Sequence, residues 1–245
     1  MTLSERELER YSRQIMIPGI GPEGQQRLKA TTVAVVGVGG LGCPSSLYLA
    51  AAGFGRIILI DDGCFELSNL NRQIHGWQND VGRPKAEVAR EKLTALNPDV
   101  EVEALTLKLT EENIDEALGE ADIILDGLDN WRTRFLINQH CVRHRKPFIH
   151  AGVRGLYGQM TTIKPGEGPC LRCIFPHNPP EEEALPVLGA TPALFASLQV
   201  IEAVKLTVGL GKPLIGRLLL IDGEEMHFEI VDVKRNPNCP ICKHL

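Results

Sequence analysis

Short apolar runs and amphipathic stretches alternate along the first 150 residues of the chain. Continuous runs of Val, Ile and Leu are typical of strands that are buried on both faces of a sheet. They predict strands at 32–36, 56–60, 121–125 and 148–151, and an alternating segment predicts another at 100–107. Stretches with helical character lie between them, at 41–52, 85–96, 111–118 and 131–145. This regular alternation favours right-handed crossovers and a parallel sheet.

The pattern changes after residue 151. Segments 159–164, 217–222 and 226–233 predict strands joined by turns, which we expect to extend the sheet in antiparallel fashion. The proline-rich and acidic stretch 176–190, which contains Glu181–Glu183, predicts an exposed loop. Segment 192–208 predicts a mostly apolar helix, packed in the core or at a subunit contact. We expect one domain in three parts: a helical 1–30, a nucleotide-binding 31–152, and a partner- and metal-binding 153–245.

Local signals predict where two helices begin and end. Ser4 and Glu7 fit a capping box, so a short helix should begin near Glu5. Gly53 follows the 41–52 stretch and should end that helix.

Composition narrows the function classes. The 245 residues carry a formal net charge of −5, which argues against a nucleic-acid-binding surface. No apolar run is long enough to span a bilayer, and the opening "MTLSERELERYSRQ" lacks the apolar stretch of a signal peptide. We therefore expect a cytoplasmic protein without a membrane partner. The seven cysteines then predict reduced thiols and metal binding rather than disulfides.

A glycine-rich turn is the strongest local signal. Gly37, Gly39 and Gly42 fit G-x-G-x-x-G between a predicted strand and a predicted helix, with Gly40 inside the turn. Backbone N–H groups in this context can approach phosphates at a helix N-terminus. Asp61 follows the second strand at the distance expected of a ribose-binding acid. The alternative is a tight turn without a ligand, and the glycines alone leave the nucleotide open between a dinucleotide and ATP.

Charged residues after Asp61 favour ATP. Arg72 and Lys85 would neutralise a triphosphate, whereas the single pyrophosphate of a nicotinamide cofactor does not need them. Asp126 and Asp129 lie at the carboxyl end of a predicted strand and offer the oxygen ligands that Mg²⁺ prefers beside phosphates. Taken singly, each has a plainer interpretation as a solvated charge or a helix cap.

Two C-x-x-C pairs predict a metal site. They are Cys170 with Cys173 and Cys239 with Cys242. Two such pairs complete a tetrahedral Zn²⁺ site with no open position, so the metal would be structural. Unrelated core cysteines and redox dithiols are the alternatives. Zinc would hold the C-terminal segment against the start of the acidic loop.

Several of these motifs together resemble one family. "RYSRQIMIPGIGPEGQQRL", "GVGGLGCP", "LSNLNRQ", "VGRPK" and "DGLDNWRTR" are similar to the ThiF/MoeB/HesA family of ubiquitin-activating-like adenylyltransferases, from about Arg10 to Cys242. The resemblance implies a Rossmann-like α/β fold whose mainly parallel sheet has helices on both faces, antiparallel C-terminal strands and a Cys₄ zinc site. It also implies an ATP site formed by the glycine turn and four further residues or segments. These are Asp61, the segment with Asn69 and Arg72, Lys85, and Asp129, which would hold Mg²⁺.

The resemblance further implies a homodimer in which Arg13 reaches into the partner's nucleotide site. It implies that the substrate is the C-terminal glycine carboxylate of a ubiquitin-like sulfur-carrier protein ending in Gly-Gly. A C-terminal carboxyl group has a pKa of about 3.5, so it is already an anion and needs no general base. Arg72, Lys85, Arg13 and the Mg²⁺ would supply charge neutralisation and alignment. The products would be an acyl-adenylate and pyrophosphate, for sulfur transfer in molybdopterin or thiamine biosynthesis.

The chain departs from the family pattern at two points. Glu182 stands where some members carry a loop cysteine, and no cysteine lies between Cys173 and Cys239. This predicts adenylation without a loop-borne thioester, with sulfur supplied by a separate donor protein. Gly63 stands where members often have a second acid. The remaining cysteines, expected to be small buried packing residues, are Cys43, Cys64 and Cys141.

Three rival functions stay open at this point. The first is ATP-dependent activation of another carboxylate, on a peptide, a small molecule or a tRNA. The second is a non-catalytic scaffold for a ubiquitin-like partner, which would not need Arg72, Lys85 and Asp129 together. The third is an NAD oxidoreductase.

Overall fold

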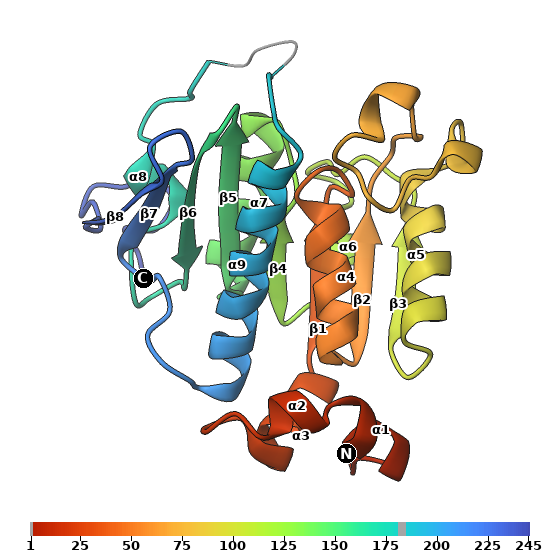
Figure 1. Ribbon diagram of the computed structural model, residues 1–245. Coiled ribbons are helices and arrows are strands. Elements are labelled where there is room, and N and C mark those ends of the chain that lie inside the picture. Colours follow the sequence, from red (N-terminus) through yellow and green to blue (C-terminus); the bar gives the residue numbers. More distant parts are fainter. Residues whose placement is uncertain (1, 181–184) are drawn as a thin grey trace.

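The computed structural model describes residues 2–180 and 185–245, and in these residues one eight-stranded sheet runs through the protein in the order β3-β2-β1-β4-β5-β6-β7-β8 (Figure 1). The strands β3 to β5 at one end of this order are parallel, and β6, β7 and β8 continue the sheet in antiparallel fashion. The strands are β1 (Thr32–Val36), β2 (Arg56–Ile60), β3 (Glu101–Leu105), β4 (Ile123–Asp126), β5 (Phe148–Arg154), β6 (Tyr157–Ile163), β7 (Arg217–Asp222) and β8 (His227–Asp232). The predicted mixed α/β fold is confirmed.

The strand β1 lies at the point where the chain reverses its direction of travel across the sheet. It pairs with β2 on one side and with β4 on the other, through Val33↔Ile57 and Val33↔Ile123. The chain moves outward from β1 to β3 and then crosses back to add β4. The loops that follow β1 and β4 therefore diverge, and ligands bind in such a crevice in open α/β sheets.

Helices cover both faces of the sheet. The α-helices of the described residues are α1 (Glu5–Arg10), α2 (Ser12–Ile15), α3 (Gly21–Lys29), α4 (Gly42–Ala52), α5 (Lys85–Leu96), α6 (Ile114–Leu118), α7 (Trp131–His144), α8 (Leu171–Ile174) and α9 (Ala190–Val208). Short 3₁₀ helices span Leu67–Asn69 and Gln78–Asp80. One face packs against α4, α5 and α9, and the other against α6, α7 and α8 (Figure 1).

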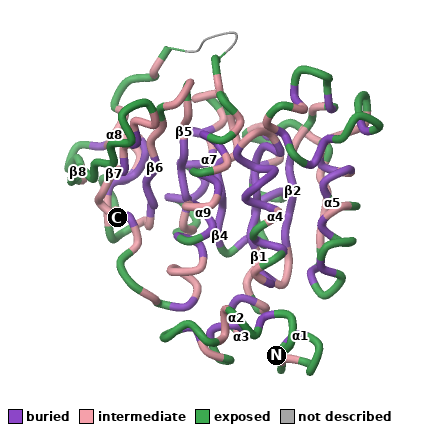
Figure 2. The backbone as a smooth tube through the Cα atoms, viewed as in Figure 1, coloured by how far each residue is buried: buried purple, intermediate pink, exposed green. Residues whose placement is uncertain are grey.

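Alternating side chains of β1 separate the two hydrophobic cores. Val33 and Val35 belong to the core under α4, α5 and α9, whereas Ala34 and Val36 belong to the core under α6 and α7. All four are buried, as Figure 2 shows for the central strands. This is the expected consequence of a period of two residues on a strand covered on both faces.

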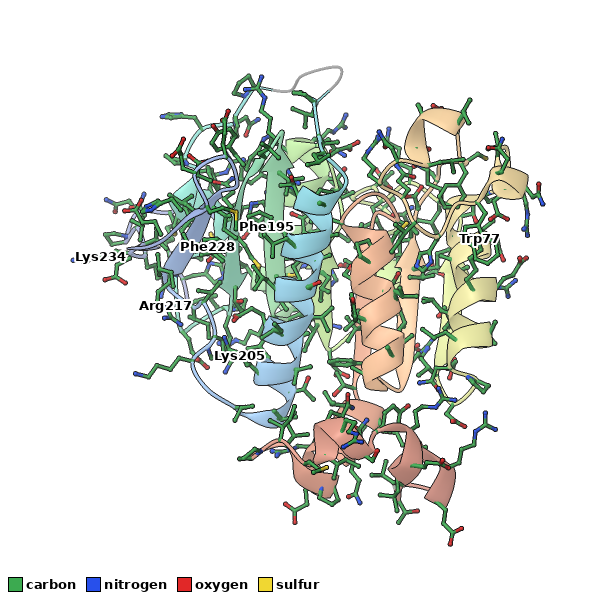
Figure 3. All side chains as sticks on the ribbon, viewed as in Figure 1. Trp77, Phe195, Lys205, Arg217, Phe228 and Lys234 are labelled. Atoms are coloured by element: carbon green, nitrogen blue, oxygen red, sulfur yellow. The ribbon has the colours of Figure 1, made fainter. Side chains whose placement is uncertain are left out.

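The apolar helix predicted at 192–208 is a core helix. Among the described residues, α9 is the one helix long and apolar enough to cross a membrane by length and composition, and half of its most apolar window is buried in the protein. Phe195 is fully buried against β6 (Figure 3), where a Cβ added at Gly158 would lie 2.2 Å from its ring. Packing against the sheet explains the composition of this helix.

Most predicted elements appear with small shifts of their ends. The ranges 32–36, 56–60, 85–96 and 217–222 match the structure, and Gly53 ends α4 with a left-handed φ of 82°. The capping box of Ser4 and Glu7 starts α1. The helix α3 was not predicted, because it contains glycine and proline; the proline is at the start of the helix, where its missing N–H costs nothing.

Candidate functional site

A cavity of about 770 Å³ opens at the carboxyl ends of β1, β2 and β4. Its walls come from the glycine turn after β1, the loop after β2, the start of α5 and the loop after β4. Leu185, Val187 and Pro192 close it from the side of α9. Its volume is in the range of pockets that bind drug-sized ligands and cofactors.

The glycines of the turn divide into two structural roles. A Cβ added at Gly37 would lie 2.6 Å from the Gly127 carbonyl oxygen, and Gly37 has a left-handed φ of 88°. A Cβ added at Gly42 would lie 1.8 Å from the Gly37 oxygen. Both residues must therefore be glycine for the fold. Gly39 instead lines the cavity, and its nearest neighbours would lie 3.7 Å or more from an added Cβ.

This division yields a testable contrast. Gly39→Ala should fold normally, because the methyl group makes only ordinary contacts, but should weaken ATP binding about tenfold, or about 1.4 kcal/mol, by occupying space beside the turn. Gly42→Ala should destabilise the protein, because the Cβ overlaps backbone. Calorimetric titration with ATP and thermal unfolding of both variants measure this. Unchanged ATP affinity of a folded Gly39→Ala would argue against phosphate binding at this turn.

The helix α4 begins directly behind the turn without a side-chain cap. The Cys43 N–H donates to the Gly39 carbonyl, but no side chain among the described residues caps the N-terminus of α4. Free N–H groups at a helix start favour an anion. Gly40 also lines this end of the cavity.

Asp61 is positioned by the backbone. One carboxylate oxygen accepts from the Val38 N–H at 2.7 Å, and the other from the Gly63 N–H at 2.8 Å. The side chain is half-buried and lines the cavity at the end of β2. Each oxygen retains acceptor capacity, so Asp61 can accept hydroxyl groups of a ligand. Gly63 contributes its N–H to this arrangement, and a Cβ there would lie 3.4 Å from the Lys85 Nζ.

Two cations face the cavity without carboxylate partners. The Arg72 Nη1 donates to the Ser68 carbonyl at 2.9 Å and to the Asn71 amide oxygen at 3.0 Å. Lys85 is the first residue of α5 and is half-buried. Within residues 2–180 and 185–245, neither side chain has an acidic group within ion-pair distance. Their positive charge is therefore available to a ligand.

Hydrogen bonds to Asn69 hold together the polar loop after β2. The Asn69 side-chain oxygen accepts from the Glu66 N–H at 3.0 Å, and its backbone carbonyl accepts from the N–H groups of Arg72 and Gln73. Asn69 is buried and lines the cavity. The loop thus holds Arg72 at a fixed place on the cavity wall.

Asp126 and Asp129 have different roles. The prediction that both offer oxygen ligands to Mg²⁺ is wrong for Asp126. Asp126 is fully buried, and its carboxylate accepts from the Arg134 Nε at 2.9 Å and the His150 Nδ1 at 2.6 Å. Burial alone would raise the pKa of Asp126, but the Arg134 charge and the His150 hydrogen bond outweigh it and lower the pKa. Its charge is already neutralised beneath the site. Asp129 is exposed in the cavity, so its carboxylate is available to a cation.

Arg13 lies at the opposite end of the molecule from the cavity. The neighbouring Tyr11 is buried and accepts a hydrogen bond from Asn97, at the end of α5. The Gln14 side chain donates to the Ala52 carbonyl at the end of α4. Because α4 runs about 16 Å from the cavity to that end, the exposed Arg13 side chain cannot reach the cavity of its own chain (Figure 1).

The four paired cysteines converge on one point. The Sγ–Sγ distances are 3.6 Å for Cys170 and Cys239, 3.4 Å for Cys173 and Cys242, and 3.9 Å for Cys170 and Cys173. Four sulfurs around one tetrahedral Zn²⁺ lie about 3.8 Å apart. No disulfide links the seven cysteines, all of which are described residues. The donor set and its spacing fit zinc, and the cluster joins the C-terminal segment to α8, just before the loop.

Removal of this cluster should be costly. We expect Cys242→Ser to destabilise the protein by about 4 kcal/mol or more, because loss of a metal ligand is among the largest single-residue effects. For a chain of this size that lowers the melting temperature by about 10 °C. Thermal unfolding with zinc quantified by mass spectrometry tests this, with Cys64→Ser as control. A wild-type protein that contains no metal after purification with zinc would contradict it.

The three remaining cysteines differ in exposure. Cys43 and Cys141 are fully buried, and burial raises the pKa of both thiols, that of Cys43 to about 12. They are packing residues, as expected. Cys64 is exposed, so that expectation is wrong for it: it lies on the loop after β2, where its backbone pairs with Pro84. Glu182, the residue at the position of the family's loop cysteine, lies outside the described residues.

Further residues that were not predicted from the sequence line or support the cavity. Gln73 is buried on the cavity wall, and its Oε1 has no hydrogen-bond partner among the described residues. The segment that carries Leu185 and Val187 is anchored on Gly155, whose N–H donates to the Pro186 carbonyl at 2.6 Å. Gln73 stands inside "LSNLNRQ", a signal that was available, whereas the anchoring of the segment depends on the fold.

Comparisons with known proteins agree on one family. A model described as the ThiF family matches residues 11–241. The protein named Sulfur carrier protein adenylyltransferase of Thermus thermophilus is 45% identical, over 99% of this chain and 93% of its own length. Protein HesA, heterocyst, of Trichormus variabilis is 44% identical, over 99% of this chain and 91% of its own. The crystal structure of E. coli MccB with ATP has a TM-score of 0.87 and 26% identity, covering 99% of this chain and 77% of MccB.

Proposed function

The chain belongs to the ThiF family and is an adenylyltransferase, and we propose that it transfers AMP from ATP to the C-terminal glycine carboxylate of a ubiquitin-like sulfur-carrier protein ending in Gly-Gly. One observation carries the proposal. A cavity at the strand ends combines a glycine turn with Arg72 and Lys85, neither of which has an acidic partner among the described residues. Such a cavity is suited to a polyphosphate that bears several negative charges.

The residues divide the reaction between them. The glycine turn and the start of α4 bind phosphate oxygens, and Asp61 accepts the ribose hydroxyls. The carrier's carboxylate, with a pKa of about 3.5, arrives ionised and attacks the α-phosphorus directly. A bond forms from the carboxylate oxygen to that phosphorus, and the bond to the bridging α–β oxygen breaks. Pyrophosphate leaves with the electron pair, and Arg72 and Lys85 neutralise the charge that develops on it.

Asp129 would hold the Mg²⁺ that accompanies the nucleotide. Its exposed carboxylate lies in the cavity and has no ion-pair partner among the described residues. It can therefore offer an oxygen ligand to Mg²⁺, a hard cation that binds oxygen. When bound, the ion would neutralise phosphate charge. Asp126 would contribute only indirectly, by holding Arg134, whose Nη2 donates to the Leu128 carbonyl at 2.5 Å.

The acceptor tail would enter from the side of the cavity away from Asp61. Val153, Leu185 and Val187 line that side, and they are apolar. A tail ending in two glycines carries no side chains there, so it can approach the phosphates closely.

A homodimer would complete the site. Because Arg13 is exposed at the far end of its own chain, we propose that it acts in the partner's cavity. An apolar stripe on α9, formed by Leu194 and Ile201, and the neighbouring Tyr48 on α4 are exposed and available for a subunit contact. We further propose a separate sulfur donor protein, a role in molybdopterin or thiamine biosynthesis, and a cytoplasmic location, where thiols stay reduced for zinc.

Activation of another carboxylate is the second candidate. The similarity to MccB, whose structures were solved with ATP and with MccA, supports it. The 45% identity to a sulfur-carrier adenylyltransferase over nearly the whole chain favours the carrier. A scaffold without catalysis would have no use for Arg72 and Lys85, two half-buried cations that line the same cavity.

The decisive experiment uses intact carriers. The protein is mixed with candidate ubiquitin-like carriers, ATP and Mg²⁺, and each carrier is weighed by mass spectrometry for an added AMP. We expect AMP on one carrier and none on the same carrier lacking its last glycine. If ATP–pyrophosphate exchange occurs only with a peptide or a small acid, the second candidate replaces the first. Tight NADH binding without ATP binding would refute both.

Sulfur transfer should proceed without a covalent carrier–enzyme thioester on the 176–190 loop, because no cysteine lies between Cys173 and Cys239. A non-reducing gel of the carrier, ATP and enzyme mixture should show no thiol-sensitive adduct. Cys64→Ser is the informative variant, since Cys64 is exposed. An adduct abolished by Cys64→Ser would assign the covalent role to that residue instead.

A further inference from the structure

A second cluster of metal-ligand side chains lies outside the cavity and outside the four cysteines. His140 and His144 are one turn apart on α7, so their rings lie on the same helix face, with centroids 4.4 Å apart. Asp115 on α6 faces both rings. We propose that Asp115, His140 and His144 bind one divalent transition-metal ion, such as Zn²⁺, Ni²⁺ or Co²⁺, between α6 and α7.

The three candidate ligand atoms already converge. The Asp115 Oδ1 lies 2.8 Å from the His140 Nδ1 and 3.3 Å from the His144 Nε2, and the three atoms lie within 4.8 Å of one another. Nitrogen and oxygen ligands of one tetrahedral ion lie about 3.3 Å apart. The His144 distance matches this value, and the His140 distance needs to open by about half an ångström.

The hydrogen bonds around His144 also favour a cation. The Arg143 guanidinium bridges the two exposed ligands: its Nε donates to the His144 Nε2 at 3.1 Å, and its Nη2 donates to the Asp115 Oδ1 at 2.5 Å. Each of these two atoms therefore presents a lone pair to the same positive group. A metal ion would take the place of this guanidinium as the cation between them.

His140 is held in place by its contact with Asp115. It is buried, and its Nδ1 donates to the Asp115 Oδ1 at 2.8 Å. An ion at Nδ1 would take the place of this proton, and the ring would carry its proton on Nε2, which has no hydrogen-bond partner among the described residues.

The two imidazoles and one carboxylate determine which class of metal ion the site would bind. This donor set suits borderline ions rather than Mg²⁺ or Ca²⁺, which take oxygen ligands. The side chains of Asp115 and His144 are 53% and 39% exposed, which leaves the ion an entry path and a water position. The Arg143 Nη2, 2.5 Å from the Asp115 Oδ1, competes with the ion and must turn away. The Lys146 ammonium is occupied by the carbonyls of Leu118, Gly119 and Ala121.

Metal binding here would join α6 to α7. The N-cap of α7, Asn130, and the buried Arg134 on its first turns both line the nucleotide cavity. A bound ion would therefore fix the far end of the helix that forms one cavity wall.

The test is a titration of the full chain carrying one equivalent of zinc. Co²⁺ is added in a calorimeter and followed by absorption, because thiolate-bound cobalt absorbs strongly in the near ultraviolet and nitrogen- and oxygen-bound cobalt does not. We expect one further equivalent without the thiolate band, and a higher melting temperature. His144→Ala and Asp115→Asn should weaken this binding at least about tenfold.

Two matched variants sharpen the result. Arg143→Ala should tighten binding, since it removes the competing charge, and His227→Ala, an exposed histidine on β8, should leave it unchanged. Binding that falls equally in His227→Ala is adventitious surface binding and overturns the proposal. A wild-type protein that takes up no further equivalent overturns it as well.

Discussion

Lys85→Ala should slow ATP–pyrophosphate exchange, measured with carrier present, by about 10²–10³-fold, the usual effect of deleting one electrostatic stabiliser of a transition state. The structure gives the reason. Lys85 opens α5 on the cavity wall, beside Gly63 and Asp61, and no acidic side chain in the described ranges forms an ion pair with it. Its charge is therefore free to neutralise the leaving pyrophosphate rather than spent on a protein partner.

The control for this variant lies on the same helix. Arg90→Ala removes an exposed cation of α5 that pairs with Glu87, so exchange should change little. Both variants should unfold within a few degrees of the wild type, because neither side chain is part of a hydrophobic core. Near-normal exchange by Lys85→Ala would remove Lys85 from the reaction, and equal losses in both variants would point to damage of α5 instead.

The fold was largely predictable because its central strands β1, β2 and β4 are buried on both faces. Runs such as 32–36 and 56–60 contain few polar residues, and a continuous apolar run of that length between turn signals has few other structural interpretations. The glycine turn was predictable for a related reason: overlap with backbone at Gly37 and Gly42 excludes any side chain. Where sterics allow only one residue type, that residue can be recognised in the sequence.

Interactions between segments that are far apart in the chain could not be predicted from the sequence. Asp126 looked like a ligand because it ends a strand, but the sequence does not show that Arg134 and His150 neutralise it from two other elements. The exposure of Cys64 depends on how the loop after β2 turns. The apolar side of the cavity needs the anchoring of Val187 on Gly155, a contact across 32 positions of the chain. Residue types alone do not fix such pairings.

A mixed dimer should recover activity that neither parent variant has. Arg13→Ala should lose exchange activity by about 10²–10³-fold, like Lys85→Ala, if Arg13 stabilises the transition state in the partner's cavity. A heterodimer of one Arg13→Ala and one Lys85→Ala subunit contains one complete site: the cavity with Lys85 intact receives Arg13 from the other subunit. Isolated through two different tags, it should show about one half of wild-type activity.

The geometry makes this outcome specific to action in trans. The helix α4 separates Arg13 from the cavity of its own chain by about 16 Å, so Arg13 cannot act in that cavity. If Arg13 did act within its own chain, the mixed dimer would show no recovery, because each of its subunits would lack one of the two groups. The control heterodimer pairs Arg13→Ala with a subunit carrying both substitutions; it has no complete site and should stay inactive. Recovery in this control would show that Arg13 is dispensable, and absence of recovery in the test heterodimer would confine Arg13 to a structural role among α1–α3.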